Sequence, residues 1–256
     1  MTEKQPAEAL FDLETVFDVD DYLFAYKDDL SAERSDAEVA QLVKVLELEH
    51  PMRILDLACG FGRHANRLAA LGYSVTGVDL MPGFLALARQ QAAEMGVQVD
   101  YRQGDMRQLD YQDEFERVLL LFTSFGYFED SQNELVVKNM TRALKPGGWL
   151  ALDTLNRDSI LKAFSPANVV EKGDDLLIDR LSFDVITGRL HNRRILIRDG
   201  VRKDKPYSVR LYSATEISQL LSRVGLVDLT LLDEKSQPLS AGSRRMLVIA
   251  RKPMQA

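Results

Sequence analysis

Apolar residues in the first fifty positions recur at a helical spacing. Ser35 and Glu38 have the arrangement of a capping box, so the pattern predicts that a helix begins at Ser35 and ends before Pro51. A shorter run of apolar and aromatic residues predicts an amphipathic helix over residues 20–27. The apolar positions of the longer helix are Val39, Leu42, Val43 and Leu46.

From residue 53 onwards, short apolar runs alternate with helical stretches. The fourth run is almost continuously apolar, as expected for a strand that is buried on both faces. This alternation predicts an α/β fold with a doubly wound, mainly parallel sheet, which two later strands extend to seven. The predicted strands span 53–57, 73–78, 97–102, 115–122, 149–153, 226–232 and 246–250, and the helices between the first five span 63–71, 82–95 and 133–144.

The alternation is interrupted over residues 155–212. Three strand-like runs, at 175–183, 189–198 and 207–212, are separated by turns and contain no helical pattern, so we expect an inserted antiparallel sheet. The helical pattern resumes at a second capping box, formed by Ser213 and Glu216.

Composition restricts the class of protein. The 256 residues are 46% hydrophobic, contain one cysteine and carry a formal net charge of −7, which excludes a disulfide framework and a cysteine-based zinc site. No apolar run approaches the roughly 20 residues that span a bilayer, and the first ten residues lack the apolar core of a signal peptide. We therefore expect a cytoplasmic protein with no membrane partner.

One segment is strongly basic despite the acidic total. Residues 189–210 contain eight arginines and lysines against two aspartates. Such a run is either the solvated face of a hairpin or a surface for an anionic partner.

The segment that carries most of the chemistry follows the first predicted strand. Asp56 lies near the end of that strand, and Ala58, Gly60 and Gly62 form a small-residue loop before a helix. Asp79 ends the next strand, where an acid can bind the two hydroxyls of a ribose. Because Asp56 would repel a pyrophosphate and attract an ammonium group, the ligand predicted is an adenosine compound with an amino-acid end rather than NAD.

Four motifs in order resemble those of class I S-adenosylmethionine-dependent methyltransferases, most closely the bacterial small-molecule N-methyltransferases. The resemblance spans residues 35–155 and the final helix and strand hairpin at 214–251. The motifs are Asp56-Leu57-Ala58-Cys59-Gly60-Phe61-Gly62, Val75-Thr76-Gly77-Val78-Asp79, Gly104-Asp105-Met106 and Leu144-Lys145-Pro146-Gly147-Gly148.

The resemblance implies a Rossmann-like domain over 35–154 and 213–256, an N-terminal leader and lid over 1–34, and an inserted substrate lid over 155–212. It also implies that S-adenosylmethionine binds and leaves as S-adenosylhomocysteine. The implied cofactor contacts are Asp56, Ala58, Cys59 and Gly60 for the methionine part, Asp79 for the ribose, Leu80, Met81, Asp105 and Met106 for the adenine, Phe122 on the open side, and Tyr26 and Arg34 from the lid.

The acceptor is less well defined by sequence. The run after the fourth strand has no Asn/Asp-Pro-Pro-Tyr motif, no cysteine and no strand-end acids, which excludes exocyclic-amine, covalent pyrimidine and metal-dependent catechol chemistry; no metal is expected. Tyr127 is the candidate catalytic residue, for orienting an acceptor amine or sensing its proton. The further candidates for substrate binding are Tyr22, Asn156, Arg157 and Arg193, with Arg193 or Arg194 facing inward.

The sequence thus predicts an enzyme, monomeric or homodimeric, that methylates a small molecule, with N-methylation by direct in-line transfer favoured. One alternative is an RNA-directed or other macromolecule-directed methyltransferase that uses the basic segment 189–210. A non-catalytic cofactor-binding protein is a second alternative, which the intact cofactor motifs disfavour.

Overall fold

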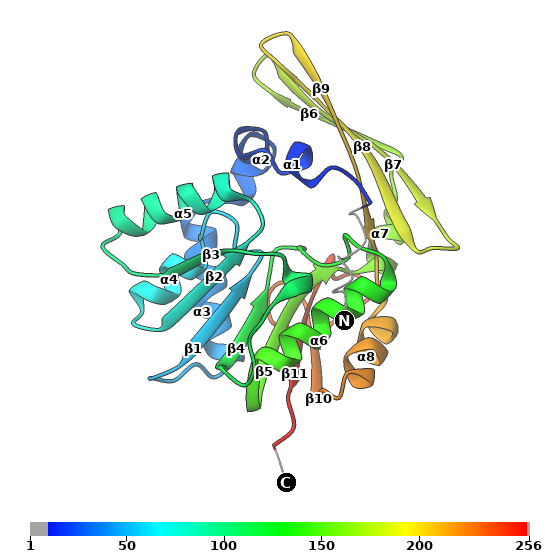
Figure 1. The fold of residues 1–256 in the computed structure, drawn as a ribbon. Helices are drawn as coiled ribbons and strands as arrows, with labels where there is room; N and C mark the ends of the chain where they lie inside the picture. Colours follow the sequence, from blue (N-terminus) through cyan, green and yellow to red (C-terminus); the bar gives the residue numbers. More distant parts are fainter. Residues whose placement is uncertain (1–9, 255–256) are drawn as a thin grey trace, which may run out of the picture.

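The central sheet has the predicted seven strands in the doubly wound order (Figure 1). This computed structural model describes residues 10–254, so the part of the predicted leader before residue 10 lies outside the described residues. The order across the sheet is β10 (Val227–Leu232), β11 (Arg245–Arg251), β5 (Leu144–Leu155), β4 (Phe115–Leu120), β1 (Arg53–Leu57), β2 (Ser74–Asp79) and β3 (Asp100–Gln103). The strands from β5 to β3 are parallel, and β11 is antiparallel to both of its neighbours.

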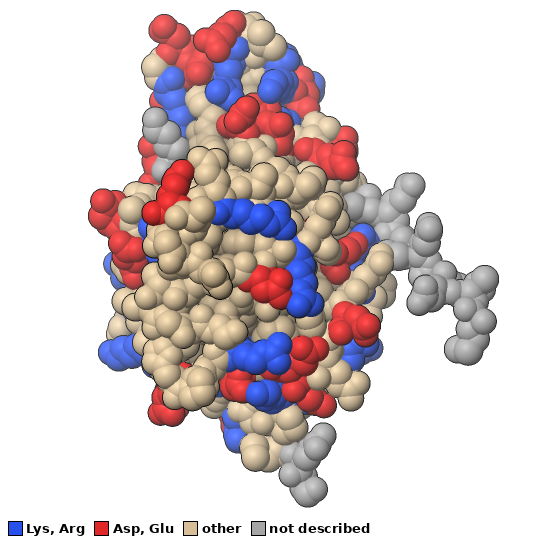
Figure 2. Space-filling view, turned by 60° about the vertical axis from the view of Figure 1, so that its left-hand side comes forward, with Lys and Arg blue, Asp and Glu red and all other residues tan. Residues whose placement is uncertain are grey.

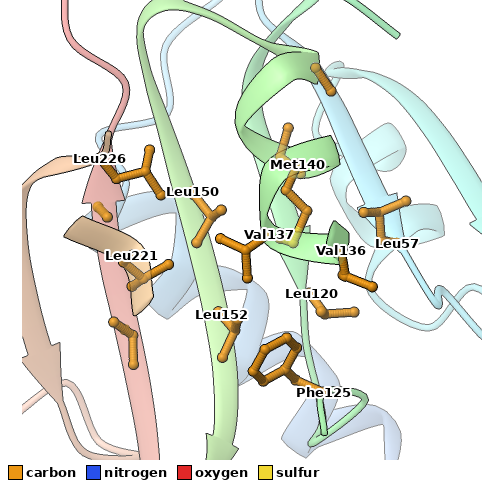
Figure 3. Packing of buried hydrophobic residues seen from close by; sticks show 14 of the residues in the cluster. Leu57, Leu120, Phe125, Val136, Val137, Met140, Leu150, Leu152, Leu221 and Leu226 are labelled. Atoms are coloured by element: carbon orange, nitrogen blue, oxygen red, sulfur yellow. The ribbon is translucent and has the colours of Figure 1, made fainter. Parts of the chain in front are cut away.

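Helices cover both faces of this sheet. One face packs against α6 (Asp130–Ala143) and α8 (Ala214–Arg223), and the other against α3 (Ala32–Val45), α4 (Ala65–Ala70) and α5 (Pro82–Glu94). Figure 3 shows the first layer, in which Val137 and Met140 of α6 meet Leu150 and Leu152 of β5. These side chains are fully buried, because the apolar face of each helix can leave water only against the sheet.

The start of α3 differs from the prediction. Ser31 is the N-cap, and its Oγ accepts a hydrogen bond from the Arg34 backbone N–H at 3.2 Å. The predicted capping box is wrong because Ser35 lies inside the helix, where its hydroxyl donates to the Ser31 carbonyl oxygen. The second predicted capping box, Ser213 with Glu216, is confirmed at α8.

Between β5 and α8 the chain forms a separate antiparallel sheet in the order β6-β7-β8-β9, and β6 is a strand that the sequence pattern did not predict. A short helix, α7 (Arg157–Lys162), precedes it. Figure 1 shows this sheet as an arm above the carboxyl ends of the central strands, with α1 (Leu13–Val16) and α2 (Val19–Tyr26) between the arm and those strand ends. The strands are β6 (Ala167–Lys172), β7 (Asp175–Asp184), β8 (Arg189–Arg198) and β9 (Val201–Arg210).

The remaining described elements are two short 3-10 turns, η1 (Lys27–Asp29) and η2 (Met106–Gln108). Within residues 10–254, no helix has the length and apolar character needed to cross a bilayer.

Candidate active site

A cavity lies at the carboxyl ends of β1, β2, β3 and β4, beneath α1 and α2. It holds about 1000 Å³ including its open mouth, which is large enough for a ligand the size of a nucleoside with a side chain. Its walls come mainly from the loops after these four strands and from the N-terminal helices. Among the predicted cofactor residues, those that line it are Asp56, Ala58, Cys59, Gly60, Asp79, Leu80, Met81, Asp105, Met106 and Phe122.

The loop after β1 brings its backbone close to the cavity. Ala58 and Gly60 have φ angles of +48° and +55°, and Gly62 has +78°. A Cβ at Gly62 would lie 2.0 Å from the hydroxyl oxygen of Tyr101, so only glycine fits there. Burial raises the pKa of the Cys59 thiol, which therefore stays protonated and acts as a small buried side chain.

The carboxylate of Asp79 is fixed at the edge of the cavity by backbone donors. The Gly60 N–H donates to its Oδ2 at 2.8 Å, and the Met81 N–H donates to its Oδ1 at 2.8 Å. Burial raises the pKa of Asp79, and these two hydrogen bonds oppose that shift. Each oxygen still has a lone pair for a ligand hydroxyl.

Two buried polar atoms in the cavity have no partner among the described residues. They are Oδ2 of Asp56 and Nη2 of Arg63. Burial raises the pKa of Asp56 to about 7, the Arg63 guanidinium opposes this, and Asp79 adds to it. Because buried polar groups are almost always satisfied, an unpartnered carboxylate oxygen and an unpartnered guanidinium nitrogen in one cavity suit a ligand that carries both charges. An α-amino acid end has that chemistry.

Arg63 is a site residue that the sequence analysis missed. Its Nη1 donates to Glu38 Oε2 at 2.5 Å and to Ser35 Oγ at 3.2 Å, which orients the guanidinium from α3. Its position, directly after the Gly-x-Gly loop, was the available signal. The neighbouring His64 contacts Glu38 at 2.8 Å, and burial lowers its pKa to about 4, so its imidazole is neutral at pH 7.

At the opposite end of the cavity, Asp105 already has a partner. The guanidinium of Arg107 donates to its carboxylate at 2.7–3.1 Å, and the Arg107 backbone N–H donates to Oδ1 at 2.8 Å. Arg107 therefore fixes the orientation of the Asp105 carboxylate and neutralises its charge, and Asp105 can still accept a hydrogen bond in the cavity.

The wall that comes from α1, α2 and the segment after β4 is aromatic and apolar. The Tyr127 ring packs against Phe11 and Phe17, with centroids 5.8 and 5.4 Å away. Burial raises the pKa of both Tyr127 and Tyr22, so both phenols stay protonated at neutral pH. The residues that line this wall are Leu13, Phe17, Tyr22, Phe122, Ser124, Tyr127 and Phe128.

Two predicted lid contacts lie elsewhere. The Tyr26 hydroxyl accepts a hydrogen bond from Arg194 Nη1 at 2.9 Å, in a smaller neighbouring cavity. Arg34 is paired with Asp29 at 2.5 Å and with Glu38 at 3.2 Å, outside the main cavity. Arg63 lines the main cavity and Arg34 does not.

Three predicted acceptor contacts are likewise absent from the cavity. Asn156 is the N-cap of α7, where its Oδ1 accepts from the Asp158 N–H and its Nδ2 donates to the Ser243 carbonyl oxygen at 2.9 Å. Arg157 pairs with Glu216 at 2.6 Å. Arg193 is exposed and pairs with Asp204 at 3.1 Å, whereas Arg194 is the inward arginine.

Every basic residue between 189 and 210 is bonded within the protein. Arg189 donates to the carbonyl oxygens of residues 126–128, and the other seven pair with carboxylates. Figure 2 shows acidic and basic side chains intermixed on the upper part of the molecule, which holds the arm. The pairs are Arg193–Asp204, Arg194–Asp179, Arg198–Asp21, Arg202–Asp204, Lys203–Asp21, Lys205–Asp21 and Arg210–Glu216.

Within the described residues, no group of three or more His, Cys, Asp or Glu side chains could hold a metal ion.

Known proteins resemble this chain in sequence and in fold. Residues 54–148 match the methyltransferase domain family. A ubiquinone biosynthesis O-methyltransferase from Xanthomonas euvesicatoria is 31% identical over 181 residues, which are 66% of this chain and 74% of the relative. A dTDP-4-amino-2,3,4,6-tetradeoxy-D-glucose N,N-dimethyltransferase from Saccharopolyspora spinosa is 29% identical, over 72% of this chain and 71% of that protein.

Among solved structures, the S-adenosylmethionine-bound amino pentose methyltransferase CalS10 from Micromonospora echinaspora superposes with a TM-score of 0.65. The identity is 21%, and the match covers 90% of this chain and 96% of the other. The predicted α/β fold, the enzyme class and the methyl donor are thus confirmed. The chain belongs to the S-adenosylmethionine-dependent methyltransferases.

Proposed function

We propose that this enzyme transfers a methyl group from S-adenosylmethionine to the nitrogen of a small amine, by direct in-line attack on the sulfonium methyl. In this proposal residues 35–154 and 213–254 bind the donor, and the lid at 10–34 with the insertion at 155–212 encloses the acceptor.

The donor is held at both ends. Asp56 Oδ2 accepts from the ammonium group of the methionine part, and Arg63 Nη2 donates to its carboxylate; both atoms otherwise lack a partner among the described residues. Asp79 accepts from the ribose hydroxyls, and Asp105 accepts from the adenine amino group. The charge of the donor's sulfonium is compatible with the aromatic rings nearby, because ring faces attract cations.

The observation that carries the choice of acceptor is the wall formed by the lid and by the segment after β4. Among the described residues, those that line this wall are apolar or aromatic, except for one serine, and include no carboxylate and no imidazole; the buried His64, which lines the cavity elsewhere, is hydrogen-bonded to Glu38. A neutral amine attacks without a base, and positioning with exclusion of water supplies most of the rate. An alcohol acceptor usually needs a general base, which this wall does not provide.

The comparisons support an amine in a second way. The Saccharopolyspora relative and CalS10 are both described as enzymes that methylate amino sugars. The Xanthomonas relative is described as an O-methyltransferase, so a hydroxylated acceptor is the competing outcome of the test.

The internal pairing of the basic segment supports a small molecule over RNA. An RNA footprint needs cations that can exchange their counterions for phosphates. Here each arginine and lysine between 189 and 210 already has a carboxylate or carbonyl partner.

The test is transfer of a labelled methyl group to matched acceptors. Sugar nucleotides with an amino group and the same compounds with a hydroxyl at that position are compared with structured RNA, with Asp79→Ala as the variant impaired in donor binding. The proposal predicts label on the amino compounds alone and a strong loss in the variant. Label on the hydroxyl compounds or on RNA, with none on amines, would contradict it.

A further inference from the structure

Two consecutive residues after β4 adopt a backbone conformation that side chains normally avoid. Phe122 has a φ angle of +55° and Thr123 has +60°, and neither is glycine. Such left-handed residues persist only where the surrounding structure holds them. Phe122 lines the donor cavity, so the conformation of this segment decides where its ring lies.

Asp153 holds both residues. It lies near the end of β5, its side chain is buried, and its Oδ2 accepts from the Phe122 N–H at 2.8 Å. Its backbone carbonyl oxygen accepts from the Thr123 N–H at 3.1 Å. One residue of the neighbouring strand thus satisfies both backbone donors of the left-handed segment.

Arg245, the first residue of β11, fixes Asp153 in turn. Its Nε donates to Asp153 Oδ1 at 3.0 Å and its Nη2 donates to Oδ2, which is the two-point geometry of an arginine–carboxylate pair. The same guanidinium lies 5.2 Å from the centroid of the Phe122 ring, and the guanidinium of Arg63 lies 4.7 Å from it.

We propose that Asp153 and Arg245 are positioning residues that hold Phe122 against Arg63 and thereby set the placement of the donor's amino-acid end. The inference rests on the proposed function, because it requires Arg63 to face the donor carboxylate. Neither Asp153 nor Arg245 lines the cavity, so both act through Phe122. Their effect is confined to the methionine end, since the adenosine end is bound by Asp79 and Asp105.

The test compares two ligands by calorimetry. S-adenosylhomocysteine carries the amino-acid end, whereas 5′-methylthioadenosine keeps the adenosine and the sulfur and lacks that end. Asp153→Asn retains an acceptor for the Phe122 N–H and removes the charge that orients Arg245. We expect this variant to bind S-adenosylhomocysteine about tenfold more weakly and methylthioadenosine within about twofold of the unchanged protein.

The chain offers a matched control on the same strand. Arg251 also pairs with an aspartate through its guanidinium, Asp228, and it lies at the far end of β11 from the cavity. We expect Arg251→Lys to leave both affinities unchanged, whereas Arg245→Lys reproduces the selective loss. If Asp153→Asn does not fold, the test uses Arg245→Lys instead. A lysine at this position still provides a cation to pair with the buried Asp153 carboxylate.

Equal loss of both ligands, or no loss of either, would overturn the positioning role. Arg63→Gln separates this from a failure of the proposed site. If Arg63→Gln weakens S-adenosylhomocysteine selectively and the Asp153 and Arg245 variants do not, only the inference fails. If Arg63→Gln has no selective effect, the donor assignment itself fails, and the positioning role fails with it.

Discussion

Asp21 of α2 and Lys205 of β9 form an ion pair with an N–O distance of 2.7 Å, and both side chains are almost completely buried. Lys203 and Arg198 reach the same carboxylate at 2.9 and 3.1 Å. Three cations of the arm therefore converge on one acid of the lid. This contact links two segments about 180 residues apart, and Asp21 and Lys205 both line the smaller cavity beside the main one.

Removal of the Asp21 carboxylate should destabilise the protein. Asp21→Ala leaves the buried Lys205 ammonium group without its carboxylate partner, and we expect a loss of about 3 kcal/mol in the free energy of unfolding. Urea denaturation measures this loss, with Asp20→Ala on the exposed side of α2 as the control. Equal stability of the two variants would show that the buried pair does not hold the lid.

Donor affinity should depend on pH through Asp56. Its pKa is raised to about 7 by burial, and only the ionised form attracts an ammonium group. Below that pKa the side chain must release a proton when the ligand binds, so the affinity falls as pH decreases, approaching about tenfold per pH unit. Calorimetric titration with S-adenosylhomocysteine should show this slope, and Asp56→Asn should abolish it. The same slope in the variant would assign the titration to another group.

Asp79→Ala should weaken both S-adenosylhomocysteine and methylthioadenosine, because both ligands contain the ribose. We expect a loss of about 1.5–3 kcal/mol in binding free energy for each. Asp100→Ala, an exposed acid at the start of β3, is the control. Unchanged affinity in the Asp79 variant would rule out its contact with the ribose.

Adding a Cβ to a glycine with a positive φ has two costs, backbone strain and steric overlap. Gly126 and Gly96 allow these two costs to be measured separately. Both have positive φ angles, +103° and +67°, but a Cβ at Gly126 would lie 2.5 Å from the Arg210 carbonyl oxygen, whereas none meets an atom within 4 Å at Gly96. We expect Gly96→Ala to cost about 1 kcal/mol and Gly126→Ala about 3 kcal/mol or more. Thermal denaturation of both variants measures the difference in stability. Equal losses of stability would show that the segment between β4 and α6 shifts to accommodate the added carbon.

The fold was predictable because its periodicities are strong. The continuous apolar run of β4 and the strand–helix alternation around it predicted the parallel sheet, and β8 was predicted at its observed bounds. The start of α3 was not predictable to the residue, because Ser31 and Ser35 both precede helical stretches and only the structure shows which hydroxyl meets a free N–H.

The residues of the site were predictable where sequence motifs define them. They were less predictable where the direction of a side chain decides what it contacts. Asp56 and Asp79 follow from their places at strand ends. Arg193 and Arg194 are adjacent, so they point to opposite faces of β8, and the sequence does not say which face is covered. Arg63 was missed because its role depends on Glu38 and Ser35, which α3 brings to it from about 25 residues away.

The most direct test of the proposed chemistry is the pH dependence of kcat/KM with two acceptor amines of different basicity. If a neutral amine attacks without an enzymatic base, the acidic limb moves with the pKa of the amine and is retained in Tyr127→Phe. A limb that stays at one pH for both amines and disappears in Tyr127→Phe would contradict the account, because it would identify Tyr127 as a base.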